Sequence, residues 1–315
     1  MTWTGKIAWL AVAALMSYGA AGEDGGSADK NAAERAVVST RAFEPAFGAG
    51  VTRTLIAADS DPCDTADLTA TPSRPVWTAG AQTTQCGVLE TDYGWLWQGL
   101  GGGFRQTAAA MSMRYGVTPR LDLRWGVPAH LTQSGGGAPA LQGVSDQSLS
   151  LTYRFAEQSS RLPAMALGYG FKIPTANPAK GFGTGFVDHQ LAFIASRDVR
   201  KLHFDFNTAG ILAGSPRGYD GAAQYGLVLS VPATKQWMFV ETDGGSLPGI
   251  ADRFGQALAG VQWSVRPWLV IDTAYTRAYT AGLPRQQFTV GWTWSTRPAP
   301  VVMARQRLAR LLGRR

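Results

Sequence analysis

The sequence has little charge and no apolar run long enough to cross a membrane as a helix. Lys, Arg, Asp and Glu make up 16% of the 315 residues, against about a quarter in an ordinary soluble domain. After residue 22, no apolar stretch approaches the roughly 20 residues that a spanning helix needs. The first absence argues against a cytosolic enzyme, and the second argues against a helical membrane protein.

Histidine and cysteine are also scarce, with three His and two Cys in the chain. No Cys or His cluster has the spacing of a metal site, so neither a metal nor another cofactor is expected. Cys63 and Cys86 suit an oxidising compartment, where they would form a disulfide between the N-terminal region and the first strand. The alternative is a pair of free thiols.

What the chain has in abundance is glycine and tryptophan, with 38 Gly and 11 Trp at a mean hydropathy of −0.07. A β-barrel in lipid requires apolar residues only at every second position, so its mean hydropathy stays near zero. This composition therefore favours a membrane barrel.

The net charge of +7 is concentrated in residues 297–315, which hold six Arg and no acid. The high pI thus describes a tail rather than a nucleic-acid-binding face, and no nucleic-acid partner is expected. Val301, Leu308 and Leu311 have helical spacing, which suits a helix on an anionic membrane surface. A disordered basic end is the alternative.

The N-terminus has the pattern of a secretory signal peptide over residues 1–22. Lys6 precedes the short apolar run Ile7–Met16, and small residues around Ala21 suit cleavage. An uncleaved anchor is the alternative, although the run is short for one. Residues 23–85 are rich in Pro, Asp and Thr, and we expect them to form an irregular periplasmic lead-in or a partial plug.

From residue 86 to 296, apolar and polar residues alternate with the period of two that is typical of strands. In one run Leu121, Leu123 and Trp125 share a face, while Asp122 and Arg124 share the other. An even number of such runs predicts an all-β fold, an antiparallel up-and-down transmembrane barrel of about 12 strands. The runs lie near residues 86–98, 104–117, 120–132, 145–156, 163–174, 187–197, 201–212, 222–231, 235–243, 254–265, 267–278 and 286–296.

The aromatic residues favour lipid over the alternative of a soluble β protein. Trp and Tyr collect near the ends of the apolar faces, as they do at bilayer interfaces. The opposite faces carry mostly Ser, Thr, Gly, Gln and Asn with few ions, as a hydrated lumen would. The chain is therefore expected in the outer membrane of a Gram-negative bacterium, with outer-membrane lipid around it.

Three hairpins carry a family resemblance: Met113–Trp125 (MRYGVTPRLDLRW), Gly143–Phe155 (GVSDQSLSLTYRF) and Leu162–Thr175 (LPAMALGYGFKIPT). In this order they resemble the outer-membrane channel family labelled for the MetA pathway of phenol degradation, over roughly residues 86–296. The resemblance implies a channel, and only the family label suggests aromatic solutes. Thr289–Trp294 looks like the closing strand that the barrel assembly machinery reads, but here the basic tail follows it.

The charged residues on the expected inner face are the candidate functional residues. They would set the electrostatics of a pore, with Glu90 beside Arg114 and Asp122 beside Arg154. The alternative is that these pairs only fill the lumen and hold the strand register. The candidates are Glu90, Asp92, Arg114, Asp122, Arg124, Arg154, Lys172, His203, Asp205, Glu241 and Asp272.

The leading hypothesis for function is a non-enzymatic channel for passive passage of small hydrophobic or amphipathic solutes. A barrel with a structural or adhesive role is the alternative, although the short expected loops argue against an adhesin. A lipid hydrolase would need a Ser hydroxyl near His203 or His189. The solute and the oligomeric state are left open.

Overall fold

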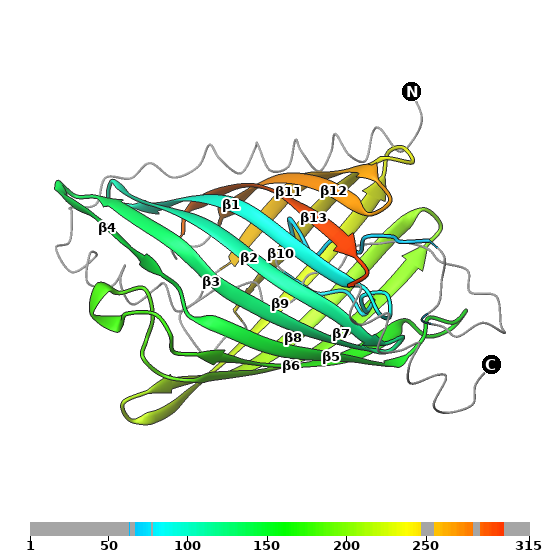
Figure 1. Ribbon diagram of the computed structural model, residues 1–315, viewed down its shortest axis with the longest axis horizontal. Coiled ribbons are helices and arrows are strands. Elements are labelled where there is room, and N and C mark those ends of the chain that lie inside the picture. The colour runs from blue at the N-terminus through cyan, green and yellow to red at the C-terminus, as the bar shows by residue number, and fades with distance from the viewer. Residues whose placement is uncertain (1–62, 64–66, 77, 247–254, 280–283, 299–315) are drawn as a thin grey trace.

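The computed structural model describes Cys63 and residues 67–76, 78–246, 255–279 and 284–298 (Figure 1). The expected signal peptide lies outside these residues, and so does the basic tail beyond residue 298. The strands are β1 Leu89–Gly101, β2 Phe104–Thr118, β3 Leu121–Gly135, β4 Ala138–Val144, β5 Gln147–Ala156, β6 Ala164–Ile173, β7 Asp188–Val199, β8 Leu202–Ser215, β9 Gly218–Pro232, β10 Trp237–Ser246, β11 Gly255–Arg266, β12 Leu269–Ala278 and β13 Gln286–Thr296.

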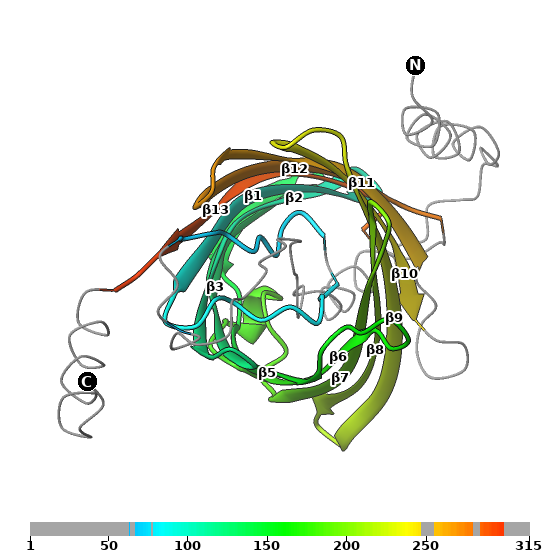
Figure 2. The same cartoon turned by 90° about the vertical axis from the view of Figure 1, so that its right-hand side faces the viewer.

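The sheet closes on itself, as the end-on view shows (Figure 2). β1 pairs with β2 on one side and with β13 on the other, and every pairing is antiparallel between neighbours. β4 pairs only with the far half of β3, whose near half pairs with β5. The closed barrel therefore has 12 strands, and the predicted fold class is confirmed.

The fourth predicted strand, residues 145–156, corresponds to β5, and the structure adds β4 before it, a strand that was not predicted. Ser145 and Asp146 separate the two strands. Instead of continuing the ladder, Ser145 donates its N–H to the carbonyl of Ala129 (2.9 Å) and accepts the N–H of Ala129 on its hydroxyl (2.8 Å). Pro128, which has no N–H to donate, lies at the same level. The ladder breaks here because the side chains of Ser145 and Asp146 bond the backbone of Ala129 and Ala176 instead.

The two faces of the wall are chemically inverted relative to a soluble protein. Large apolar residues such as Trp125, Trp237 and Trp294 are exposed on the outside, while Thr242 and Thr293 are buried inside. Trp237 and Trp263 stack at one rim, with ring centroids 5.4 Å apart. Within the described residues, no helix is long and apolar enough to cross a membrane.

The two ends of the barrel differ. At the end where β1 begins and β13 ends, adjacent strands are joined by short turns, such as residues 119–120 and 200–201. In outer-membrane barrels the short turns face the periplasm. At the opposite end, residues 174–187 form a longer loop with a 3-10 turn, η2 (Pro178–Lys180). Its Phe182 is buried against Gly143 of β4.

Candidate channel lumen

A segment of the N-terminal region, described over residues 67–76 and 78–85, lies inside the barrel at the short-turn end (Figure 2). It forms no strand, and Pro72 and Pro75 remove two of the donors that a ladder would need. Inward side chains of the wall bind its backbone instead. Asn207 accepts the N–H of Ala79 at 2.9 Å, and Ser196 accepts the N–H of Ala81 at 2.7 Å.

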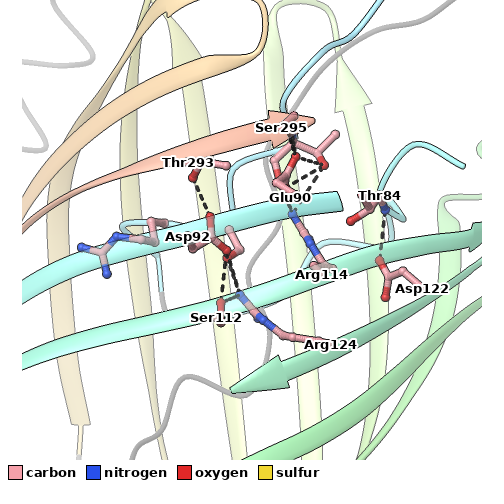
Figure 3. Close-up of polar contacts among 12 residues, drawn as sticks. Thr84, Glu90, Asp92, Ser112, Arg114, Asp122, Arg124, Thr293 and Ser295 are labelled. Carbon is pink, nitrogen blue, oxygen red and sulfur yellow. Dashed lines mark hydrogen bonds and ion pairs between the residues drawn. The ribbon is translucent and has the colours of Figure 1, made fainter. Parts of the chain in front are cut away.

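Glu90 of β1 is the first charged anchor of this segment and is fully buried. Its carboxylate accepts the N–H of Thr71 (2.7 Å) and the hydroxyl of Ser295 (2.9 Å). Arg114 of β2, directly across the ladder, forms an ion pair with Glu90 and donates to the carbonyl of Thr71. Both ends of the pair therefore hold the inner segment as well as each other (Figure 3).

Asp92 and Arg124 form the second anchor, one pleat further along the barrel. The Nη2 atom of Arg124 lies 3.2 Å from the Asp92 carboxylate and 3.2 Å from the Ser112 hydroxyl. Asp92 also accepts the hydroxyls of Thr293 (2.6 Å) and of Ser73 from the inner segment. The carboxylate thus joins β1, β2, β3, β13 and the segment in one network (Figure 3).

The expected pair of Asp122 and Arg154 is wrong. Asp122 lies opposite Thr152 in the register and accepts the N–H of Thr84 at 3.0 Å. Arg154, two residues further along β5, instead contacts the Glu157 carboxylate (3.2 Å) and donates to the carbonyl of Pro119 (2.8 Å). Both side chains face inward, but a shift of one pleat separates them.

Arg74 is a cation that the inner segment itself supplies and that the sequence pattern did not indicate. Its Nε lies 3.4 Å from the Asp272 carboxylate, which is fully buried on β12. The guanidinium occupies space that only two facing glycines leave open, because a Cβ on Gly94 or Gly291 would overlap it. Two glycines opposite each other on neighbouring strands are the signal that could have indicated a close approach.

Apolar contacts fasten the segment to the rest of the wall. Ala79 and Ala81 pack on inward apolar residues of β6, β7 and β8, including Ala166 and Ile194. Val76 packs with Val228 and its neighbours on β9–β12. The segment therefore contacts most of the barrel circumference, which is consistent with its curved path in Figure 2.

His203 and Asp205 lie on the inner face of β8, but their geometry does not suit a hydrolase. The imidazole is held between two carboxylates, with Nδ1 2.8 Å from Asp198 and Nε2 3.0 Å from Asp205. The Ser196 hydroxyl donates to Asp205 (2.5 Å) rather than to the imidazole. His189 contacts the phenolic oxygens of Tyr169 and Tyr219 instead of a serine.

Lys172 lies near the opposite end of the lumen and belongs to another network. Its ammonium group contacts Asp188 (2.7 Å), Asp146 (3.5 Å) and the hydroxyl of Thr184 (2.8 Å). Asp146 also accepts the N–H of Ala176 at 2.8 Å. These contacts secure the 174–187 loop to the ends of β5, β6 and β7.

Glu241 does not face the lumen, contrary to the sequence analysis. Val240 and Thr242, its neighbours on β10, are buried against the interior, and Phe239 is exposed on the outside. Because side chains alternate along a strand, Glu241 shares the outer face with Phe239. The stretch from Trp237 to Val240 is apolar throughout, so no alternation indicates which face Glu241 shares. Its charge was the basis for placing it in the lumen, and that placement was wrong.

Cys63 and Cys86 form a disulfide. Cys86 lies three residues before β1 and forms an isolated β-bridge with Gly116 near the end of β2. A Cβ on Gly116 would overlap the carbonyl of Gln85, so glycine is required for this close approach. The disulfide therefore attaches the start of the inner segment to the barrel rim.

Beyond the charged anchors, an uncharged strip of glutamines lines the lumen on four adjacent strands. Gln133, Gln106, Gln98 and Gln287 are direct register neighbours. The amide of Gln98 donates to Gln287 (3.3 Å), which donates to Gln256 (3.2 Å). At the level of the anchors there is a small cavity of about 10 Å³, lined by Ala79, Gly80, Gln82, Arg114, Asp122, Arg124 and Thr152.

Comparisons with known proteins identify the architecture. No protein-family model matches the chain, and no curated protein matches it in sequence. The solved COG4313 outer membrane channel from Pseudomonas putida F1 superposes with a TM-score of 0.54 at 13% identity, over 69% of this chain and 98% of that chain. This is the fold of an outer-membrane β-barrel.

The barrel is thus placed in the outer membrane of a Gram-negative bacterium. The KdgM porin superposes less closely, with a TM-score of 0.47 at 7% identity over 66% of this barrel's chain and 99% of the porin. In the described residues, no group of three or more His, Cys, Asp or Glu side chains could hold a metal ion.

Proposed function

We propose that this barrel is a passive channel for small hydrophobic or amphipathic solutes, with the inner segment 67–85 acting as a partial plug. The observation that carries the proposal is the contrast between the two halves of the lumen. Near the short-turn end the lumen holds a segment bound by charged anchors, and beyond it the wall formed by β13, β1, β2 and β3 presents uncharged amides. The likeness to a solved outer-membrane channel supports the same direction.

The plug leaves little room for a hydrated ion. The charged side chains nearest to it are paired with one another, so few free charges remain to replace an ion's hydration shell. A solute of low polarity loses less on leaving water and would tolerate such a path better. The family resemblance suggests aromatic compounds within this class.

No catalytic role is proposed. The imidazoles of His203 and His189 contact carboxylates and phenols rather than a serine hydroxyl, whereas a hydrolase needs a Ser–His contact. A structural or adhesive role has no observation in its favour, because most strand connections in the described residues are short turns.

The test is single-channel conductance of the refolded mature protein in planar bilayers. We expect small discrete steps from the wild type. Arg124→Ala should give larger conductance steps with a stronger preference for cations, because it removes the ion-pair partner of Asp92 and one hydrogen-bond partner of Ser73. Glu241→Ala is the matched control, since Glu241 lies on the outer face and its loss should leave conductance and ion selectivity unchanged.

Liposome uptake addresses the solute class. Vesicles containing the barrel should take up a small neutral aromatic faster than protein-free vesicles, and a charged sugar of similar size no faster. Electrical silence of Arg124→Ala, in a protein shown to be folded by heat-modifiable gel mobility, together with no facilitated uptake, would overturn the channel proposal.

A further inference from the structure

The outer face of β10 carries two carboxylates where a lipid-facing strand is expected to be apolar. Glu241 and Asp243 alternate with the buried residues Val240, Thr242 and Gly244 and therefore point outward. Glu241 is four residues from Trp237, about 13 Å along the strand. With a strand tilt of about 40°, that is roughly 10 Å of height, well within an apolar band of about 25 Å.

Neither carboxylate forms an ion pair with the part of the chain that the structure describes. Asp243 accepts one hydrogen bond, from the phenolic hydroxyl of Tyr279 at 3.4 Å. Charges that face lipid are costly, so such residues usually face a protein or a polar cavity. Something other than acyl chains is therefore expected to cover this part of β10.

A cation lies on the same outer face two strands away. Asp243 is the register partner of Ala257 on β11, and Ala257 is the register partner of Arg277 on β12. Arg277 is exposed and follows the outward-facing Tyr275 by two residues. Asp243 on β10 and Arg277 on β12 therefore lie on either side of β11, each one strand away from it.

The outer surface of β11 between these charges carries short side chains. The outward positions of β11 beside the charges are Ala257 and Ala259, whereas Trp263 stands at the rim. Gly255, the next outward position, is covered by the ring of Tyr279. A second surface could approach the backbone here closely, as small residues permit in membrane interfaces. A partner that fits must offer a cation to β10 and an anion to β12.

A second copy of this chain meets that requirement. Rotation by 180° about an axis parallel to the barrel axis and passing over β11 exchanges β10 and β12, so the surface is complementary to itself. We propose that two copies associate in the outer membrane about such an axis, with Glu241 and Asp243 of each copy facing Arg277 of the other. An anionic lipid headgroup would be repelled by the two carboxylates and fits less well.

The proposal does not depend on channel activity and is tested by cross-linking in the membrane. In a twofold interface, residues on the axis approach their own counterparts, so Ala257→Cys should form a covalent dimer with a short thiol cross-linker. Ala109→Cys is the matched control, because Ala109 lies on the outer face of β2 opposite Trp95. Neither experiment is confused by the native cysteines, which are bonded to each other.

Charge reversal tests the contacts themselves. In the Ala257→Cys background, Arg277→Glu should lower the dimer yield at least tenfold. Adding Glu241→Lys and Asp243→Lys should restore the yield. The neutral variant Glu241→Gln, Asp243→Asn should also lose the dimer, and it keeps the outer face insertable if the reversed chains fail to fold.

Three results would overturn the proposal. One is equal cross-linking at residues 257 and 109, and another is a dimer yield that is insensitive to charge reversal. The third is a complex whose mass equals this chain plus a different partner. Mass measurement of the cross-linked band in the folded, heat-modifiable fraction distinguishes a second copy from any other occupant.

Discussion

Replacing Gly94 with Ala should displace Arg74 from its place beneath the barrel wall. An added Cβ would lie 2.2 Å from the Arg74 Cζ atom and close to both of its terminal nitrogens. Its three nearest neighbours all belong to this one side chain, so the guanidinium must move. Asp272, which is fully buried, would then lose the cation that lies 3.4 Å away.

The size of the effect follows from burial. Removing one partner of a buried ion pair costs about 3–5 kcal/mol. The Arg74 side chain keeps 20% of its surface exposed and the contact is long, so we reduce this value to about 2–3 kcal/mol. Replacing a strand glycine with Ala by itself stabilises the fold by about 0.5–1 kcal/mol. The expected net loss is therefore about 1–2.5 kcal/mol.

The assay is urea-induced unfolding in liposomes, followed by tryptophan fluorescence. Gly210→Ala is the control, because a Cβ on Gly210 of β8 meets nothing within 4 Å. The control should stabilise the barrel slightly while Gly94→Ala destabilises it. Adding Asp272→Asn to Gly94→Ala should recover stability, since no buried charge then lacks a partner. If Gly94→Ala and Gly210→Ala shift unfolding in the same direction, the reasoning about Arg74 is wrong.

Three further predictions concern the other attachments of the inner segment and the loop. Asp92→Asn should cost about 3 kcal/mol, because Arg124 is then buried without its carboxylate, and conductance noise should rise as Ser73 is released. Cys86→Ser should lower unfolding stability by about 3 kcal/mol, the value for a bridge closing a loop of this order, and reduction of the wild type should match it; an unchanged urea midpoint would refute this. Phe182→Ala should speed proteolysis within residues 174–187 at least severalfold without altering cleavage elsewhere, because its ring is what packs the loop on Gly143.

The strand pattern could be predicted because lipid and water impose opposite demands on alternate residues. The runs near 120–132 and 286–296 correspond closely to β3 and β13. The run near 145–156 corresponds to β5, but β4 before it was not predicted, and Ser145 and Asp146 separate the two strands with hydrogen bonds to Ala129 and Ala176. Periodicity does not record such a break.

The candidate site was predicted less completely than the fold. Glu90 and Arg114 were expected as neighbours, and the register does place them opposite each other. Asp122 and Arg154 were wrongly expected to be neighbours, because a register shift of two residues changes the cross-strand partner without changing the face of the sheet. Arg74 was missed because it comes from an irregular segment, where no period indicates which way a side chain points.

The sequence by itself determined that this chain forms a closed barrel with an apolar outside, because alternation and composition are local properties that any strand of such a wall must satisfy. Only the tertiary structure decided that residues 67–85 occupy the lumen, that Arg74 joins Asp272, and that Glu241 faces outward. These placements depend on strand register and on packing between residues nearly 200 positions apart. At such separations the hydrogen-bond geometry across the wall selects the partner of a side chain, and the identity of a single residue does not.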